Sequence, residues 1–89
     1  MKVELFGMAR ALAGVSNVEL ALDEPVELRE FLRALGDAVP ALIPGVIAPA
    51  ADALVEPNLL LLDGRRALGE GETFGEADRP CILFLASGG

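Results

Sequence analysis

The sequence contains no histidine, tryptophan or tyrosine, and only one cysteine among its 89 residues. Cys81 has no second cysteine to pair with, so an internal disulfide is excluded. Without histidine or a second thiol, the chain also lacks the usual ligands of a structural zinc ion. This cysteine usage is typical of a reducing compartment, and we expect a cytoplasmic protein. The apolar neighbours of Cys81 predict a small core residue and not a nucleophile.

Positive charge is scarce: the sequence has 7 Lys and Arg and 14 Asp and Glu, which gives a net charge of −7. An acidic surface repels the phosphates of nucleic acid and of anionic lipid, so we expect neither as a partner. It suits a partner with a basic docking surface, or it only keeps the protein soluble. The acidic residues between positions 70 and 78 do not follow the spacing of a calcium loop. We therefore expect no metal site and no tightly bound cofactor.

Long apolar runs are also absent. The first residues, 1–5, alternate apolar with charged and lack the apolar segment of a signal peptide. The longest stretch of low charge, residues 38–51, contains three prolines and is too short to span a bilayer. The length and the 53% hydrophobic content predict a single domain over residues 1–89, with a flexible tail at 87–89.

Two segments near the start have the period of half-buried strands. Residues 2–6 and 17–22 alternate polar with apolar, and we expect them to pair as a hairpin. The Ala- and Gly-rich residues 7–16 between them predict a helical turn or a loop.

The clearest helix follows the second strand. Its apolar stripe has the i, i+3, i+4, i+7 spacing of one helix face and consists of Leu28, Phe31, Leu32 and Leu35. Residues 23–25, Asp-Glu-Pro, are expected to cap and begin this helix, and Gly36 is expected to end it.

The second half of the chain predicts short strands joined by loops. Residues 40–57 hold four of the six prolines, which indicates an ordered loop with one helical turn near 48–54. Residues 58–62 form a buried-type strand, and Asp63-Gly64 predicts a turn into a second strand at 65–68. Residues 81–86 form the last strand. One helix covers one face of such a four- to five-stranded sheet, and a helical crossover permits a parallel pair, so we expect a mixed sheet.

The sheet has a surplus of apolar residues. Residues 59–62 and 82–85 are apolar on both faces, whereas a sheet with one solvated face alternates. We interpret the excess as a partner surface on the face that the helix leaves open. Two alternatives are that the segment 40–57 folds over this face, or that a homodimer covers it. On the last strand, Ile82 and Phe84 share one face, and Cys81, Leu83 and Leu85 share the other.

Two segments resemble a known family. Residues 6–14 (Phe-Gly-Met-Ala-Arg-Ala-Leu-Ala-Gly), and the acidic residues 76–79 before an apolar strand ending in Ser87-Gly88-Gly89, resemble the small subunit of molybdopterin synthase. Other ubiquitin-like sulfur carriers and modifiers share this ending. The resemblance covers essentially the whole chain and implies an α+β, ubiquitin-like β-grasp fold with one main helix on one face of the sheet. It also places Ile82 against that helix.

The resemblance implies a carrier and not an enzyme. A ubiquitin-activating-type adenylating enzyme would supply ATP and join AMP to the Gly89 carboxylate, and a sulfur donor would convert the product to a thiocarboxylate. The large synthase subunit would then receive the tail for molybdenum cofactor synthesis. The implied site residues are Gly89 as the reacting group, Gly88 for access to narrow channels, and Phe6, Leu83, Leu85 and Ser87 as partner contacts.

Elementary chemistry supports a role for the terminal glycines. A carboxylate is a weak acyl donor and needs a good leaving group, and glycines pass through narrow channels because they have no side chain. Three alternatives remain open: a protein modifier attached through Gly89, a sulfur carrier for tRNA thiolation or thiamine synthesis, and an interaction domain that ignores the tail. Lys2 is the only lysine, so attachment of the protein to itself would be confined to Lys2 and the N-terminus.

Overall fold

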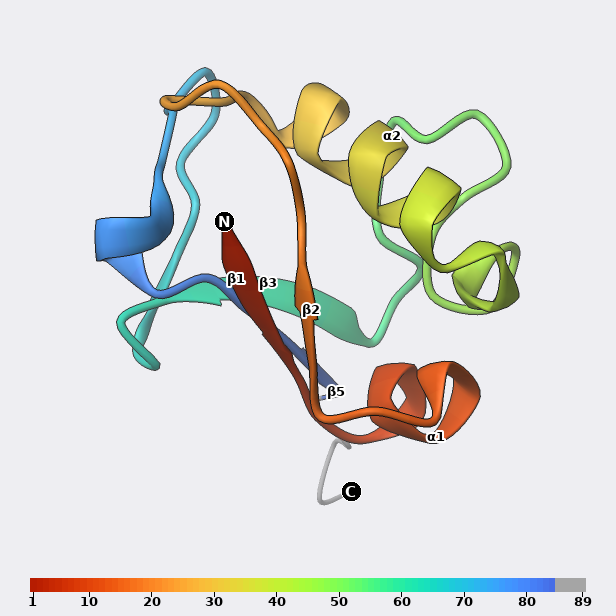
Figure 1. Ribbon diagram of the computed structural model, residues 1–89. Coiled ribbons are helices and arrows are strands. Elements are labelled where there is room, and N and C mark those ends of the chain that lie inside the picture. Colours follow the sequence, from red (N-terminus) through yellow and green to blue (C-terminus); the bar gives the residue numbers. More distant parts are fainter. Residues whose placement is uncertain (85–89) are drawn as a thin grey trace.

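The computed structural model describes residues 1–84, and the predicted continuation of the last strand to residue 86 and the tail at 87–89 lie outside this range. A single sheet crossed by one main helix makes up the body (Figure 1). In chain order the elements are β1 (Lys2–Leu5), α1 (Met8–Ala13), β2 (Asn17–Glu19), α2 (Leu28–Ala38), η1 (Pro40–Leu42), β3 (Asn58–Leu62), β4 (Arg66–Ala67), η2 (Glu76–Asp78) and β5 (Cys81–Phe84).

The sheet is mixed, as predicted. Its strand order is β2-β1-β5-β3-β4, with β1 and β5 parallel and the other neighbouring pairs antiparallel. The expected pairing of the first two strands is confirmed, and α1 fills the connection between them. That helix ends at Gly14, whose φ of 75° is the left-handed conformation that glycine adopts most readily.

The core lies between the inner face of the sheet and α2. Val3 and Leu5 of β1 are buried and alternate with more exposed neighbours, which is the period-two pattern of a half-buried strand. Ile82 on β5 is fully buried beside them, as expected. The predicted stripe on α2 packs onto this face, with Phe31, Leu32 and Leu35 fully buried and Leu28 half-buried.

Helix α2 starts later than predicted. Residues 23–25 do not begin it, because Val26 forms an antiparallel bridge with Phe74, and that bridge holds this stretch extended. The helix begins at Leu28, and Glu27 precedes it without a side-chain cap. The Phe74 ring packs edge-on against Phe31, with ring centroids 5.1 Å apart. The bridge between Val26 and Phe74, which lie 48 residues apart in the sequence, therefore determines where α2 starts.

The predicted stop at Gly36 is also wrong. Gly36 is buried inside α2, where a Cβ would lie 3.0 Å from the Ile43 side chain. The glycine thus permits close approach of the following loop. The helix ends at Ala38 because Pro40 disfavours helical geometry at the preceding residue, Val39.

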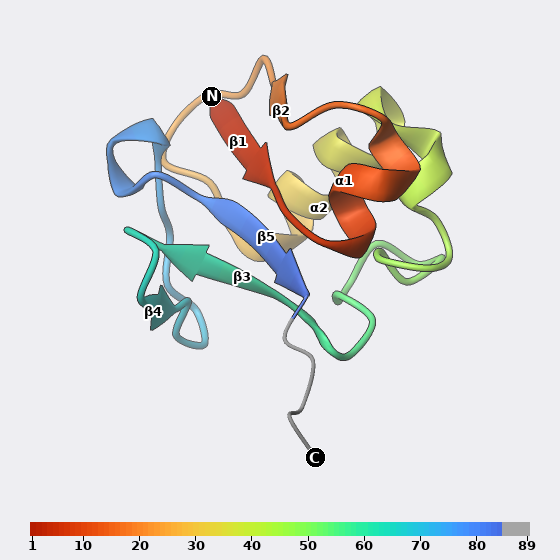
Figure 2. The same cartoon turned by 90° about the horizontal axis from the view of Figure 1, so that it is seen from below.

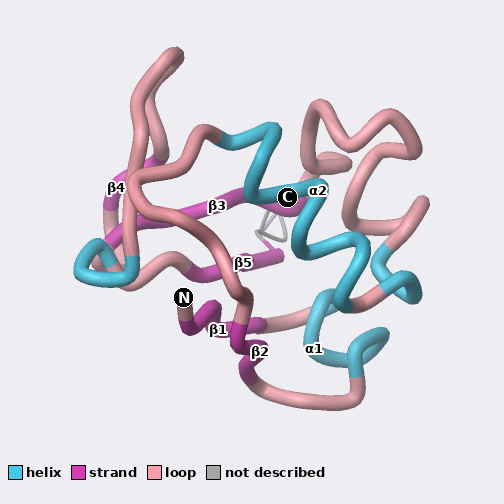
Figure 3. The backbone as a smooth tube through the Cα atoms, turned by 45° about the horizontal axis from the view of Figure 1, so that its top comes forward, coloured by secondary structure: helices cyan, strands magenta, loops and turns pink. Residues whose placement is uncertain are grey.

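The proline-rich segment 40–57 packs beside the helices. Leu42, Val46 and Ile47 are fully buried in the same core as α2, and η1 contacts both α1 and α2. The helical turn expected at 48–54 is wrong, because Ile47 bridges Leu54 and the chain turns tightly between them. Figure 3 shows this segment beside α2, on the helix side of the sheet. The alternative in which it folds over the opposite face is therefore wrong.

The turn at Asp63-Gly64 is confirmed. Both residues have positive φ, 56° and 72°, and the Arg65 N–H donates to the Leu62 carbonyl at 3.2 Å. The strand after the turn is shorter than the predicted 65–68, because β4 consists of Arg66 and Ala67 alone. Within residues 1–84, no helix is long and apolar enough to cross a membrane.

Candidate functional site: the outer face of the sheet

Strand β5 lies in the middle of the sheet, between β1 and β3, and its odd-numbered residues face away from α2. Leu83 pairs with Leu59, and Cys81 pairs with Leu61. Phe6, directly after β1, joins the same face. We call these five residues the outer patch: Phe6, Leu59, Leu61, Cys81 and Leu83. Figure 2 looks onto the sheet from this side, with β1, β5 and β3 in front of α2.

The outer patch is the part of the sheet that the rest of the body leaves open. Leu59, Leu61 and Leu83 are half-buried, and Phe6 is 39% exposed. Because α2 and the segment 40–57 pack on the inner face, neither of them covers the patch. A cluster of large apolar side chains on an open sheet face is typical of a partner surface.

The other half of the same face is charged. Lys2 pairs with Glu19 and Glu4 pairs with Asn17 across β1 and β2, so all four point outward beside the patch. A small hollow of about 110 Å³ joins the two halves, and its lining includes Glu4, Phe6, Arg79 and Cys81. The face is therefore divided into an apolar half on β5 and β3 and a charged half on β1 and β2.

Cys81 lies in the patch but is 8% exposed. Burial raises the pKa of its thiol, and the nearby Glu4 carboxylate raises it further, against a smaller opposing effect of the Leu61 backbone N–H. A thiol with a raised pKa carries little thiolate, which is the reactive form. This burial agrees with the prediction of a small packing residue.

Of the residues that the resemblance assigns to partner contact, the structure places Phe6 and Leu83 together on the outer face. Leu85, Ser87, Gly88 and Gly89 lie outside the described residues, so their roles stay predictions. Leu59 and Leu61 were not among the predicted site residues. The apolar run 59–62 contained the signal, but the face that each leucine occupies depends on the register between β3 and β5.

Gly7 positions the end of β5. Its φ is 63°, and a Cβ at this position would lie 2.7 Å from the Cβ of Phe84. The Phe6 N–H donates to the Ile82 carbonyl at 2.9 Å immediately before it. Because glycine has no side chain, the chain after β1 can lie in close contact with β5, the strand that precedes Gly88 and Gly89 in the sequence.

The amino group of Met1 is held by the charged half of the face. It forms an ion pair with Glu19 at 2.8 Å and donates to the Leu20 carbonyl. The hydrogen bond to Glu19 raises the pKa of this amine, helped by the charges of Glu19, Glu76 and Glu24 and opposed by desolvation. Lys2, in contrast, is exposed. Of the two amines predicted as self-attachment sites, the Met1 amine is thus held by an ion pair and a hydrogen bond, whereas Lys2 is exposed to solvent.

The sheet order and the single crossing helix define a ubiquitin-like β-grasp fold, as the sequence predicted. No protein-family model and no curated protein matches the chain. Two solved structures of small archaeal modifier protein 1 (SAMP1) from Haloferax volcanii are similar to it. One has a TM-score of 0.78 and 27% identity over 99% of this chain and 97% of that chain. The other has a TM-score of 0.76 and 25% identity over 96% and 95%.

Within residues 1–84, no three side chains of the His, Cys, Asp and Glu types gather as a metal site.

Proposed function

We propose that this chain is a ubiquitin-like carrier that acts through the carboxylate of Gly89 after activation by an adenylating enzyme. The observation that carries the proposal is the position of β5. This strand presents Leu83 in the middle of the outer patch, and Gly89 follows its last residue, Phe84, by five positions in the sequence. A partner that docks on the patch would hold the reacting end of the chain nearby. The likeness to a small archaeal modifier protein over almost the full length of both chains supports the same conclusion.

The chemistry follows from the weakness of a carboxylate as an acyl donor. The partner enzyme would join the Gly89 carboxylate to AMP from ATP, with release of pyrophosphate. A sulfur nucleophile would then displace AMP and leave a thiocarboxylate. Docking on the outer patch offsets the conformational entropy lost when the tail is ordered in a narrow site. The carrier supplies recognition and a reacting end, and the partners supply the catalytic groups.

We assign the sulfur to molybdopterin synthesis, with the large subunit of molybdopterin synthase as the receiving partner. The resemblance of residues 6–14 and 76–79 to the small synthase subunit supports this assignment. Gly7 belongs to the first of these segments and packs closely against Phe84, the last described residue of β5. The first segment therefore contacts the strand that precedes Gly88 and Gly89 in the sequence.

A second candidate is a protein modifier joined to lysines of target proteins through Gly89. The similarity to a protein described as a modifier favours it. Both candidates share the acyl-adenylate and differ in the atom that displaces AMP, which is sulfur in one case and a lysine nitrogen in the other.

Intact-protein mass spectrometry tests the shared proposal. With ATP, sulfide and the cognate adenylating enzyme, the mass should rise by about 16 Da, because sulfur replaces one oxygen of the Gly89 carboxylate, the acyl group that carries the reaction. C-terminal peptide mapping should place the change on Gly89, and Cys81→Ser should react like the unchanged protein. Sulfur found on Cys81 would overturn the mechanism.

The two candidates separate in a second measurement. A carrier for molybdopterin should be retained by the large synthase subunit and transfer its sulfur to a pterin precursor. A modifier should instead yield branched peptides in which Gly89 is joined to a target lysine. Branched peptides without sulfur transfer would replace the first candidate by the second.

A further inference from the structure

The exposed large apolar side chains gather at one end of the molecule. Among residues 1–84, five large aliphatic or aromatic side chains are more than a third exposed: Phe6, Met8, Leu12, Val15 and Ile43. Phe6 belongs to the outer patch. The other four come from α1, from the residue pair after it and from the residue that follows η1. Helix α1 contacts η1, and Figure 3 shows the two beside the end of α2.

The contacts of Gly45 show how α1 and the chain after η1 join into one surface. A Cβ at this position would lie 3.5 Å from Cδ1 of Leu12 and 4.0 Å from the sulfur of Met8. Exposed Pro44 alone separates Gly45 from Ile43. We call this surface the end patch, defined by Met8, Leu12, Ile43 and Pro44.

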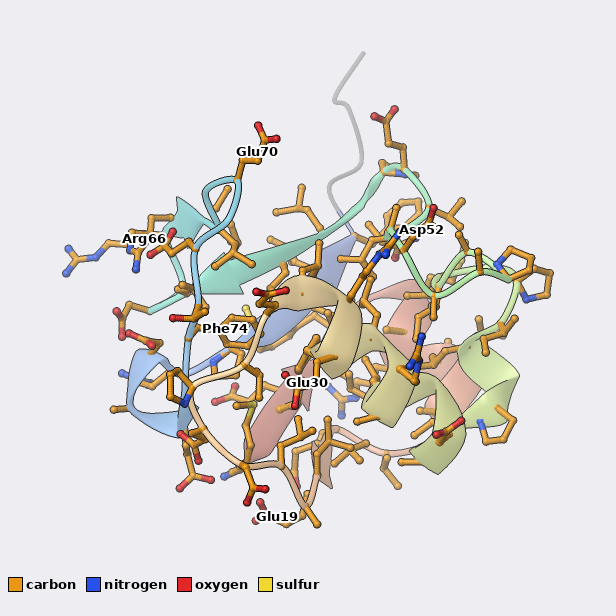
Figure 4. The ribbon with its side chains drawn as sticks, turned by 90° about the horizontal axis from the view of Figure 1, so that it is seen from above. Glu19, Glu30, Asp52, Arg66, Glu70 and Phe74 are labelled. Atoms are coloured by element: carbon orange, nitrogen blue, oxygen red, sulfur yellow. The ribbon has the colours of Figure 1, made fainter. Side chains whose placement is uncertain are left out.

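This end of the molecule carries no carboxylate on its two main segments. The two longest stretches of the sequence without Asp or Glu are residues 5–18, which include α1, and residues 38–51, which include η1. Acidic side chains are spread over the rest of the body, and Figure 4 labels four of them, Glu19, Glu30, Asp52 and Glu70. In the cores of protein interfaces charged residues are depleted in the same way.

The one charged residue in these two stretches lies away from the end patch. Successive residues of a helix are about 100° apart, so Met8 and Leu12 share one side of α1 and Arg10 lies about 160° from both. The last turns of α2, beside Ile43, add Arg33 and Asp37, one charge of each sign. The end patch is therefore apolar at its centre and has no excess of negative charge at its rim.

We propose that the end patch binds a second copy of this chain, in a symmetric dimer that sets Leu12 of one protomer against Leu12 of the other. In a twofold contact a surface meets a copy of itself. A charged surface would then face its own sign, whereas an apolar surface without net charge is complementary to itself. Because each copy carries a net charge of −7, two copies approach most favourably through the end that lacks carboxylates.

The outer patch is less suited to a contact between two copies. Glu4 and Glu19 lie on the same face of the sheet, so a symmetric contact there would bring the carboxylates of both copies together. The end patch is also a poor site for the other expected classes of partner. A basic protein finds no carboxylate in it, and an anionic lipid surface is repelled by the net charge.

The expected dimer is weak. Four residues of each protomer form its centre, and interfaces of less than about 1,200 Å² in total belong to weak complexes, so we expect a dissociation constant on the order of 0.1 mM. Sedimentation equilibrium of the full chain at concentrations up to about ten times this value measures it. Added salt should strengthen the dimer, because it screens the repulsion between two acidic copies. A contact held by ion pairs would respond in the opposite way.

A pair of opposite substitutions at one position tests the symmetry of the contact. Leu12→Glu and Leu12→Lys should each weaken dimerisation at least about tenfold, because like charges meet across the twofold axis. An equal mixture of the two variants should associate again, because Glu of one protomer then meets Lys of the other. Leu12 is exposed and both replacements are good helix formers, so the thermal transition of each variant should persist.

Two controls locate the contact. Ala77→Glu adds the same charge as Leu12→Glu at an exposed position of η2, at the other end of the body from α1 (Figure 1), and should leave the dissociation constant within about twofold. Leu83→Asp, in the outer patch, should also leave the dimer in place.

Amide resonances of the ¹⁵N-labelled protein should shift with concentration at Leu12 and Ile43 and stay constant at Leu59 and Leu83. The proposal is overturned if the protein remains a monomer up to about 1 mM, ten times the expected dissociation constant. It is also overturned if the mixture of Leu12 variants does not associate, if Leu12→Glu dimerises like the unchanged protein, or if Leu83→Asp abolishes the dimer.

Discussion

The two halves of the outer face offer a partner different chemistry. On β5 and β3, the half-buried side chains of Leu59 and Leu83 are apolar, so recognition by the outer patch depends on apolar area and shape. On β1 and β2, Glu4 and Glu19 are charged, and the Glu19 carboxylate is already paired with the amine of Met1. Recognition by this half depends on complementary charge. One face of a mixed sheet can therefore present two unlike surfaces, because each strand contributes alternate residues to it.

The largest expected effect comes from shortening the tail, which should stop the proposed chemistry and leave both halves of the outer face unchanged. Deleting Gly88 and Gly89 should abolish sulfur transfer, because two extended residues span about 7 Å and acyl transfer tolerates misplacement of only about 1 Å. The free energy of unfolding should change by less than about 0.5 kcal/mol, because no apolar side chain is removed. Thiocarboxylate formation followed by mass spectrometry, together with urea unfolding, measures both. Transfer at the normal rate by the shortened chain would leave the interaction-domain alternative.

A substitution in the outer patch should break one side of the comparison alone. Leu83→Asp places a charge where the proposed partners dock, and we expect their affinity to fall by at least about tenfold, as for a central interface residue. The thermal transition should persist, because Leu83 is half-buried and points away from α2. If the thermal transition disappears, Leu83 is a core residue and the patch is smaller than described.

Gly7 tests how firmly the patch is joined to the core. Gly7→Ala should lower the free energy of unfolding by about 2 kcal/mol, because it adds backbone strain at positive φ and a clash with Phe84. Gly64→Ala is the matched control, since its φ is also positive but no atom lies within 4 Å of the added Cβ. Its cost should be about 1 kcal/mol, from strain alone. Equal losses in urea unfolding would show that the contact with Phe84 contributes nothing.

The smallest effect concerns the charged half of the outer face. The pKa of the Met1 amine is raised in the folded protein above its ordinary value of 8.0, so the stability that it contributes is fully present below that pH. That contribution is lost as the pH rises through the folded-state pKa. Glu19→Gln removes the main cause of the raised pKa, so the melting temperatures of the two proteins should differ at pH 7 and converge at alkaline pH. A difference that stays constant with pH would contradict this.

The sequence predicted the parts of the fold that depend on local pattern. The alternation of Val3 and Leu5 and the helical stripe through Phe31 and Leu35 both identified the core side of their elements. The start of α2 could not be read locally, because it depends on the distant bridge from Val26 to Phe74. The prolines of residues 40–57 indicated a loop but not that the loop would bury three large side chains.

The same limit applies to the outer patch. Alternation along the last strand placed Cys81 and Leu83 on the face that Ile82 does not occupy, so these two patch residues followed from the sequence. The positions of Leu59 and Leu61 depend on the register of β3.

The engagement of the Met1 amine also limits how the protein can be handled. A purification tag fused ahead of Met1 would convert the ammonium to an amide and remove its ion pair with Glu19. Under the proposed function, a tag after Gly89 would block the reacting carboxylate. Gly71 offers a better place, because it lies in an exposed turn where no atom is within 4 Å of an added Cβ. A short tag inserted there would leave both ends of the chain in their native chemical form.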